Sequence, residues 1–131
     1  MKHISSRSHG VLDYVVGALL LVAPFLFGFS EDEPARNAAW IVGAGSLLYS
    51  LVTAYELSIA KIIPYRIHLG LDLAAGVFLA ASPWLMGFAD RIFAPHLIVG
   101  LLEIGVALLS RSAHSGAHDP HLPHTPAPAS H

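Results

Sequence analysis

Long stretches of the chain carry no charge, and these stretches set the expected architecture. No Asp, Glu, Lys or Arg occurs in segments 14–30, 37–55 and 73–89, which are 17, 19 and 17 residues long. A fourth segment, 92–110, has 19 residues and a single acid, Glu103. Because a helix rises about 1.5 Å per residue, each segment would span roughly 26–28 Å, close to the hydrocarbon core of a bilayer. The pattern predicts four transmembrane helices, an all-α bundle.

The expected helices run over residues 8–29, 35–56, 64–88 and 93–111. A buried helical bundle of a soluble protein is the alternative, and it is disfavoured because no segment has a polar face wide enough to meet water. Residues 1–111 therefore form one membrane domain. The remaining segment, 112–131, has four prolines and five histidines and few large apolar groups. Such a composition predicts a disordered tail.

The second half of the chain repeats the first. Each copy has the pattern His-x3-Asp-x3-Gly-x6-Pro-aromatic-Leu-x-Gly-Phe, and the copies begin 59 positions apart, at His9 and His68. The second helix of each copy carries small and polar residues spaced 3, 4 and 3, at an offset of 57: Gly43, Ser46, Ser50 and Thr53, then Gly100, Glu103, Ala107 and Ser110. This is the pattern of a duplicated helical hairpin, with repeats at about 8–56 and 64–111. Such repeats are parallel and related by a pseudo-two-fold axis along the membrane normal.

The motif Ser82-Pro83-Trp84-x-x-Gly87-Phe88, inside a predicted membrane helix and paired with an earlier copy, resembles the SPW-repeat family of small bacterial membrane proteins. The resemblance covers about residues 5–111. The first copy departs from the motif, since Ala23-Pro24-Phe25 replaces Ser-Pro-Trp. The resemblance implies a bacterial membrane protein without an established activity, and it supplies no catalytic residues.

The repeated motif has a structural interpretation. Pro83 would bend its helix, Ser82 would bond a carbonyl that the proline leaves free, and Trp84 would lie at the headgroups. A gate at the bend is the functional alternative. The residues assigned to this structural motif are Pro24, Phe25, Gly28, Ser82, Pro83, Trp84 and Gly87. The glycines inside the apolar helices are interpreted as points of close helix packing: Gly17, Gly28, Gly43, Gly76, Gly87 and Gly100.

Two His/Asp pairs form a candidate polar site. His9 and Asp13, like His68 and Asp72, are spaced i, i+4, so each pair shares one helical face. If the axis brings the first and third helices together, the four side chains converge into a plausible set of ligands for a divalent metal. The alternative is local, with each Asp stabilising a helix start and each His at the interface. We therefore assign no metal and no cofactor.

Glu103 completes the candidate polar site. It lies about nine residues into the fourth helix, where an acid is costly and usually faces the bundle. It would be a proton or cation site, or a protonated side chain that bonds Ser46, Ser50 or a backbone carbonyl. The tail histidines His114, His118, His121 and His124 are irregularly spaced, so a solvated tail is favoured over a metal site there.

Charge and composition exclude some classes of partner and predict how the chain is oriented in the membrane. The chain has no cysteine, which excludes disulfides and thiol catalysis, and its net charge of −2 argues against nucleic acid. Five Lys and Arg residues lie on the side of the termini and the central linker, against two on the other side: Lys2, Arg7, Lys61, Arg66 and Arg111, against Arg36 and Arg91. This asymmetry predicts an inner-membrane protein with both termini in the cytoplasm.

The expected function is a non-enzymatic structural or partner-binding membrane unit with no catalytic residues. Its partners would be the lipid bilayer and a second copy or another membrane protein. The alternative is a small oligomeric transporter or a proton- or cation-coupled channel that uses Glu103 and the His/Asp pairs. A membrane metalloenzyme built on the same pairs is a third hypothesis.

Overall fold

The computed structural model describes residues 5–53 and 62–117, in which four helices form two hairpins. The helices are α1 (Ser6–Leu26), α2 (Glu33–Leu51), α3 (Tyr65–Leu85) and α4 (Ala94–Ala117). The described residues contain no β-strand, only an isolated bridge between Thr53 and Ile63. The predicted all-α fold is therefore confirmed.

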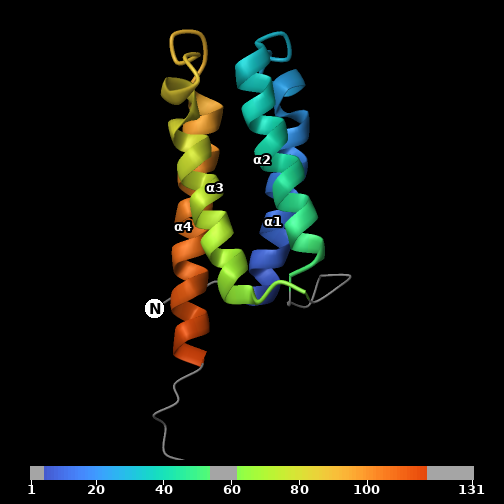
Figure 1. Cartoon of the computed structure of the whole chain (residues 1–131), viewed down its shortest axis with the longest axis vertical. Helices are drawn as coiled ribbons and strands as arrows, with labels where there is room; N and C mark the ends of the chain where they lie inside the picture. The colour runs from blue at the N-terminus through green and yellow to red at the C-terminus, as the bar shows by residue number, and fades with distance from the viewer. Residues whose placement is uncertain (1–4, 54–61, 118–131) are drawn as a thin grey trace, which may run out of the picture.

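The first hairpin, α1 with α2, lies beside the second hairpin, α3 with α4 (Figure 1). Packing is most extensive within each hairpin, and the hairpins meet through α2 against α3 and α1 against α4. In Figure 1, α1 and α3 begin at the same end of the bundle, and both short loops lie at the other end. We call the first of these the polar end, after the His/Asp pairs near the starts of α1 and α3, and the second the loop end. The predicted four-helix bundle of two parallel tandem hairpins is thus observed.

The first helix of each hairpin is terminated by a glycine that lies two residues beyond its last helical residue. Gly28 and Gly87 have φ angles of 74° and 75°, a left-handed conformation that costs glycine little. The amide of Phe29 donates to the Pro24 carbonyl at 2.8 Å, as does the amide of Phe88 to the Pro83 carbonyl. α1 and α3 therefore stop before the predicted ends, residues 29 and 88. No atom lies within 4 Å of a Cβ built on either glycine, so their prediction as close-packing points is wrong.

Close packing is found at the other four glycines. A Cβ on Gly43 would lie 3.0 Å from the Gly17 carbonyl oxygen, across the first hairpin. In the second hairpin, a Cβ on Gly100 would lie 2.7 Å from the Gly76 carbonyl oxygen and 2.5 Å from the backbone nitrogen of Ala80. Two helix backbones can approach this closely only where the residues in contact are Gly or another small residue such as Ala80.

The outer ends of α2 and α4 differ from the prediction. α2 ends at Leu51 rather than at Glu56, and α4 continues to Ala117 rather than ending at Arg111. The predicted tail thus begins in helix, because its first residues, Ser-Ala-His-Ser-Gly-Ala, contain no proline to stop α4. The rest of that tail, 118–131, and residues 54–61 of the linker lie outside the described residues.

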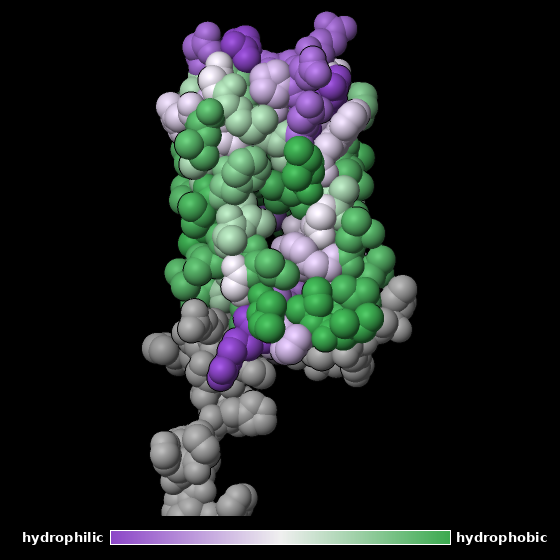
Figure 2. Space-filling model, viewed as in Figure 1, coloured by the Kyte–Doolittle hydropathy of each residue, from purple (hydrophilic) through white to green (hydrophobic). Residues whose placement is uncertain are grey.

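The bundle has a small apolar core near the loop end and an apolar outer surface. The core includes Leu20, Leu79 and Phe88, each at most 2% exposed. Leu48 and Leu85 are 67% and 70% exposed, and similar side chains cover the helices (Figure 2). Figure 2 also shows hydrophilic residues gathered at the loop end. Soluble monomers rarely expose so much contiguous apolar surface, whereas lipid covers it at no cost.

Two of the helical stretches, Arg7–Leu26 and Tyr65–Leu85, are long and apolar enough to cross a membrane. Ala94–Ser110 is a shorter apolar stretch. Length and composition therefore support membrane spans directly for α1 and α3, the helices that carry the His/Asp pairs.

Candidate functional site

The two His/Asp pairs meet in the bundle, between α1 and α3 at the polar end. His9 Nε2 lies 2.6 Å from Asp72 Oδ2, and His68 Nε2 lies 2.6 Å from Asp13 Oδ2. Within each helix, the His9–Asp13 and His68–Asp72 pairs are 3.1 and 3.0 Å apart. Both imidazoles are at most 1% exposed. The convergence proposed from the repeat is therefore present, and we call these four residues the His/Asp cluster.

The second nitrogen of each imidazole is held by a hydroxyl from the opposite hairpin. His9 Nδ1 on α1 lies 2.7 Å from Ser110 Oγ on α4, and His68 Nδ1 lies 2.7 Å from Thr53 Oγ1, which follows α2. Thr53 and Ser110 are the equivalent positions of the 57-residue offset. Each histidine thus bonds the other hairpin twice, through a carboxylate and through a hydroxyl.

The hydrogen bonds of His68 show that its Nδ1 carries a hydrogen atom. The hydroxyl of Thr53 donates to the Tyr49 carbonyl at 2.6 Å, so its oxygen accepts from Nδ1–H of His68. The other nitrogen, Nε2, then faces carboxylate oxygens of Asp13 and Asp72, which only accept. A neutral imidazole would oppose its lone pair to both oxygens. A cation, either a proton or a metal ion, must therefore lie between them.

The cluster departs from symmetry at Tyr49. The phenol of Tyr49 donates to Asp72 Oδ1 and lies 3.2 Å from Ser46 Oγ. At the 57-residue offset, the equivalent of Tyr49 is Val106, which has no donor. Asp72 consequently accepts a hydrogen bond from Tyr49, whereas Val106, the equivalent residue, offers none to Asp13.

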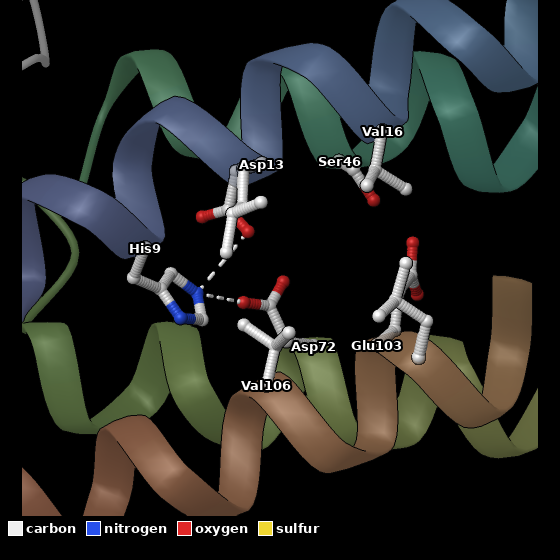
Figure 3. Close-up of a pocket in the computed structure, with 9 residues that line it drawn as sticks. His9, Asp13, Val16, Ser46, Asp72, Glu103 and Val106 are labelled. Carbon is white, nitrogen blue, oxygen red and sulfur yellow. Dashed lines mark hydrogen bonds and ion pairs between the residues drawn. The ribbon is translucent and has the colours of Figure 1, made fainter. Parts of the chain in front are cut away.

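A cavity of about 20 Å³ lies on the side where Val106 replaces a tyrosine, and it has room for a water molecule. Figure 3 shows Glu103 and Ser46 facing each other across it, with His9 and Asp72 to one side. Among the described residues, Glu103 Oε2 is buried with no hydrogen-bond partner. The expected bond from Glu103 to Ser46 or Ser50 is not formed: Ser46 bonds Tyr49 instead, and the buried Ser50 Oγ has no hydrogen-bond partner among the described residues.

The Ser-Pro-Trp motif lies away from this cluster, at the loop end of α3. Ser82 Oγ donates to the Leu79 carbonyl at 2.7 Å, the carbonyl whose helical partner would be the missing N–H of Pro83. Trp84 is 58% exposed and its ring centroid is 6.0 Å from that of Phe93. The Ser82 hydrogen bond is the one that the structural interpretation expects, while the bend at Pro83 and the position of Trp84 at the headgroups stay predictions. The equivalent Phe25, 66% exposed, packs beside Trp40.

The loop end holds two features that sequence reasoning missed. His96 is buried between Phe29 and Phe88, and its Nε2 donates to the Ala35 carbonyl at 2.8 Å. Its signal was a lone imidazole in an apolar segment without a counterpart in the first repeat. Arg91 Nε donates to Asp32 Oδ2 at 2.6 Å, and this hydrogen bond holds the pKa of Asp32 below its usual range.

Sequence reasoning also missed how Tyr49, Thr53 and Ser110 act on the cluster. Thr53 and Ser110 stood on the repeated polar stripes, and their equivalence could have paired them with the equivalent histidines. Tyr49 is not part of those stripes and has no polar counterpart, so the repeat carried no signal for it.

Comparison with known proteins supports this architecture at the level of the family. The model of the SPW repeat domain matches residues 7–110 of the chain. Searches of curated proteins and of solved structures found no match. The match includes both hairpins, the His/Asp cluster and the Ser-Pro-Trp motif. The chain belongs to the SPW-repeat family and is a membrane protein.

Proposed function

We propose that this chain is a non-enzymatic structural or partner-binding unit of the bacterial inner membrane. It crosses the membrane four times, as a duplicated hairpin, with both termini in the cytoplasm. The His/Asp cluster then serves to hold the two hairpins in one arrangement, and the apolar outer surface contacts lipid and other membrane helices, including those of a second copy.

The reciprocal pairing of His9 with Asp72 and of His68 with Asp13 carries this proposal. Both bonds join α1 to α3, two helices of different hairpins. Removing a partner from a buried pair leaves an uncompensated charge, so such a cluster specifies one arrangement strongly. Its imidazoles and carboxylates are occupied by one another, which favours a structural role over a reaction with a substrate.

Transport is the second candidate, favoured by the cavity beside Glu103. A buried carboxyl oxygen without a partner, next to a cavity that reaches Asp13 and Asp72, is the kind of group that carries protons or cations. A single chain offers little space, so this function would require an oligomer.

Flux through reconstituted liposomes separates the two candidates. Under the structural proposal, wild-type protein should carry protons and Zn²⁺ no faster than empty liposomes, at any pH between 5 and 8, a window chosen as roughly that of histidine titration. Glu103→Gln should behave as wild type. A pH-dependent flux that Glu103→Gln abolishes, while the variant remains folded, would contradict the structural proposal and favour transport.

Cysteine labelling tests the proposed topology. Single cysteines at Ser30 and Asp90 should react with a membrane-impermeant reagent added outside the inner membrane, and a cysteine at Ser58 should not. The reverse pattern would overturn the orientation, and labelling of all three would argue against four spans.

A further inference from the structure

We propose that His9, Asp13, His68 and Asp72 bind one divalent transition-metal ion of the Zn²⁺ class. This inference goes beyond the proposed function, because the cluster can join the hairpins whether protons or a metal ion lie between its nitrogens and oxygens. It can therefore fail while the structural role stands.

The donor set is the first argument. Each of the four side chains offers one ligand atom, and these atoms lie within 4.8 Å of one another. Two imidazole nitrogens and two carboxylate oxygens are ligands that Zn²⁺ takes in four-coordinate sites. Ligand bonds near 2.0 Å imply about 3.3 Å between neighbouring ligand atoms in a tetrahedron. The N–O separations here are 2.6–3.1 Å, so a small outward movement of the side chains accommodates the ion.

The surrounding hydrogen bonds are the second argument. Histidines that bind metals nearly always donate their other ring N–H to an oxygen, which fixes the tautomer. His68 Nδ1–H donates to Thr53, so Nε2 faces the cluster. His9 makes the equivalent contact to Ser110. Tyr49 holds Oδ1 of Asp72 and leaves Oδ2 toward the imidazoles.

Charge is the third argument. Two carboxylates and two neutral imidazoles carry a charge of −2, which one divalent cation neutralises. The same balance requires two protons if no metal binds. A buried cluster therefore needs either two protons or one metal ion. The hydrogen bonds of His68 show that a cation must lie between Nε2 and the carboxylate oxygens of Asp13 and Asp72. Since metal binding displaces those protons, affinity for the metal should fall as pH is lowered.

The test uses full-length protein in detergent, stripped with a chelator and titrated with Zn²⁺. The five tail histidines are first changed to Gln, so that only the cluster and His96 and His3 remain as imidazole donors. We expect one Zn²⁺ per chain, weaker at pH 5.5 than at pH 7.5, on the two sides of the usual histidine range of roughly pH 6–7. Asp13→Asn should weaken binding by about 100-fold or more. His96→Gln, which removes a buried histidine outside the cluster, should leave binding unchanged.

Two results would overturn the proposal: no stoichiometric Zn²⁺ in the tail-substituted protein, or equal binding by folded Asp13→Asn. If Asp13→Asn does not fold, Co²⁺ bound to the tail-substituted protein decides. The intense visible absorption of tetrahedral Co²⁺ supports the site, and the weak absorption of octahedral Co²⁺ excludes it. Absence of metal would not disturb the structural role, which is tested separately by coupling across the hairpins.

Discussion

The two hairpins carry the same residue types at some equivalent positions and different ones at others. They agree at the His and Asp of the first helix, at the hydroxyl of position 53 or 110, and at the glycine that ends the first helix. They disagree at Tyr49 against Val106 and at Ser46 against Glu103. The matching His, Asp and hydroxyl residues build and hold the His/Asp cluster, and three of the differing residues, Ser46, Glu103 and Val106, line one cavity.

The loop end gives a second contrast. Asp32 and Arg91 occupy equivalent positions, 59 residues apart, and form a salt bridge between the two loops. Equivalent residues close to a two-fold axis face each other, so identical charges there would repel. Opposite charges at this position turn a repulsive contact into an attractive one. A difference between the two repeats at Asp32 and Arg91 thus creates an attractive contact between the hairpins.

Loss of a cluster carboxylate should have the largest effect, and an unequal one. Asp72→Asn should lower the free energy of unfolding by about 3–5 kcal/mol, the usual cost of breaking a buried pair. Asp13→Asn should cost less, because only Asp72 also accepts from Tyr49. Denaturation in detergent, followed by helical circular dichroism, measures both. Equal losses would show that Tyr49 contributes nothing to the difference between hairpins.

The glycine contacts should come next. Gly100→Ala should destabilise the protein by about 3 kcal/mol, because the added methyl meets backbone atoms that cannot move aside. Gly105→Ala, on the same helix with nothing within 4 Å, is the matched control and should be neutral or slightly stabilising. If both variants unfold alike, close backbone packing of α3 against α4 is not what holds the second hairpin.

The serine of the motif should have a modest effect. Ser82→Ala removes the donor to the Leu79 carbonyl and should cost about 1 kcal/mol, as for an ordinary hydrogen bond. The first hairpin already has Ala23 at the equivalent position. The same unfolding measurement checks this, and a loss of several kcal/mol would mean that Ser82 has a further partner or role.

The loop salt bridge should have the smallest effect, and it should depend on pH. Arg91 lowers the pKa of Asp32, so the bridge stabilises the folded protein above the ordinary aspartate pKa of about 4 and is lost as pH falls through the lowered value. The stability difference between wild type and Arg91→Gln should therefore be constant near neutral pH and vanish in acid. A difference that grows in acid would contradict this assignment.

Much of the fold could be predicted because the signals were local or repeated. Charge-free segments marked the helices, and the 59-residue repeat paired them into hairpins. The helix ends were less accurate, since Gly28 and Gly87 stop their helices through a backbone conformation that spacing does not reveal. Their assignment as packing points failed for the same reason.

The candidate site was only half predictable. The i, i+4 spacing placed His9 with Asp13, but the bonds that matter most, to Asp72 and Ser110, cross the molecule and depend on how the hairpins dock. The partner expected for Glu103 was wrong: the hydroxyl of Ser46 donates to the phenol oxygen of Tyr49, whose own hydrogen goes to Asp72. That competition between side chains appears only once three helices are placed together.

The central claim is that the His/Asp cluster joins the two hairpins, and a double-mutant cycle tests it most directly. Free energies of unfolding are measured for wild type, His68→Gln, Asp13→Asn and the double variant. We predict a coupling of about 2 kcal/mol, because the pair lies in direct contact across the hairpins. The control cycle of Asp13→Asn with Asp32→Asn, at opposite ends of the bundle, should give no coupling. A coupling between His68 and Asp13 within error of zero would contradict the account.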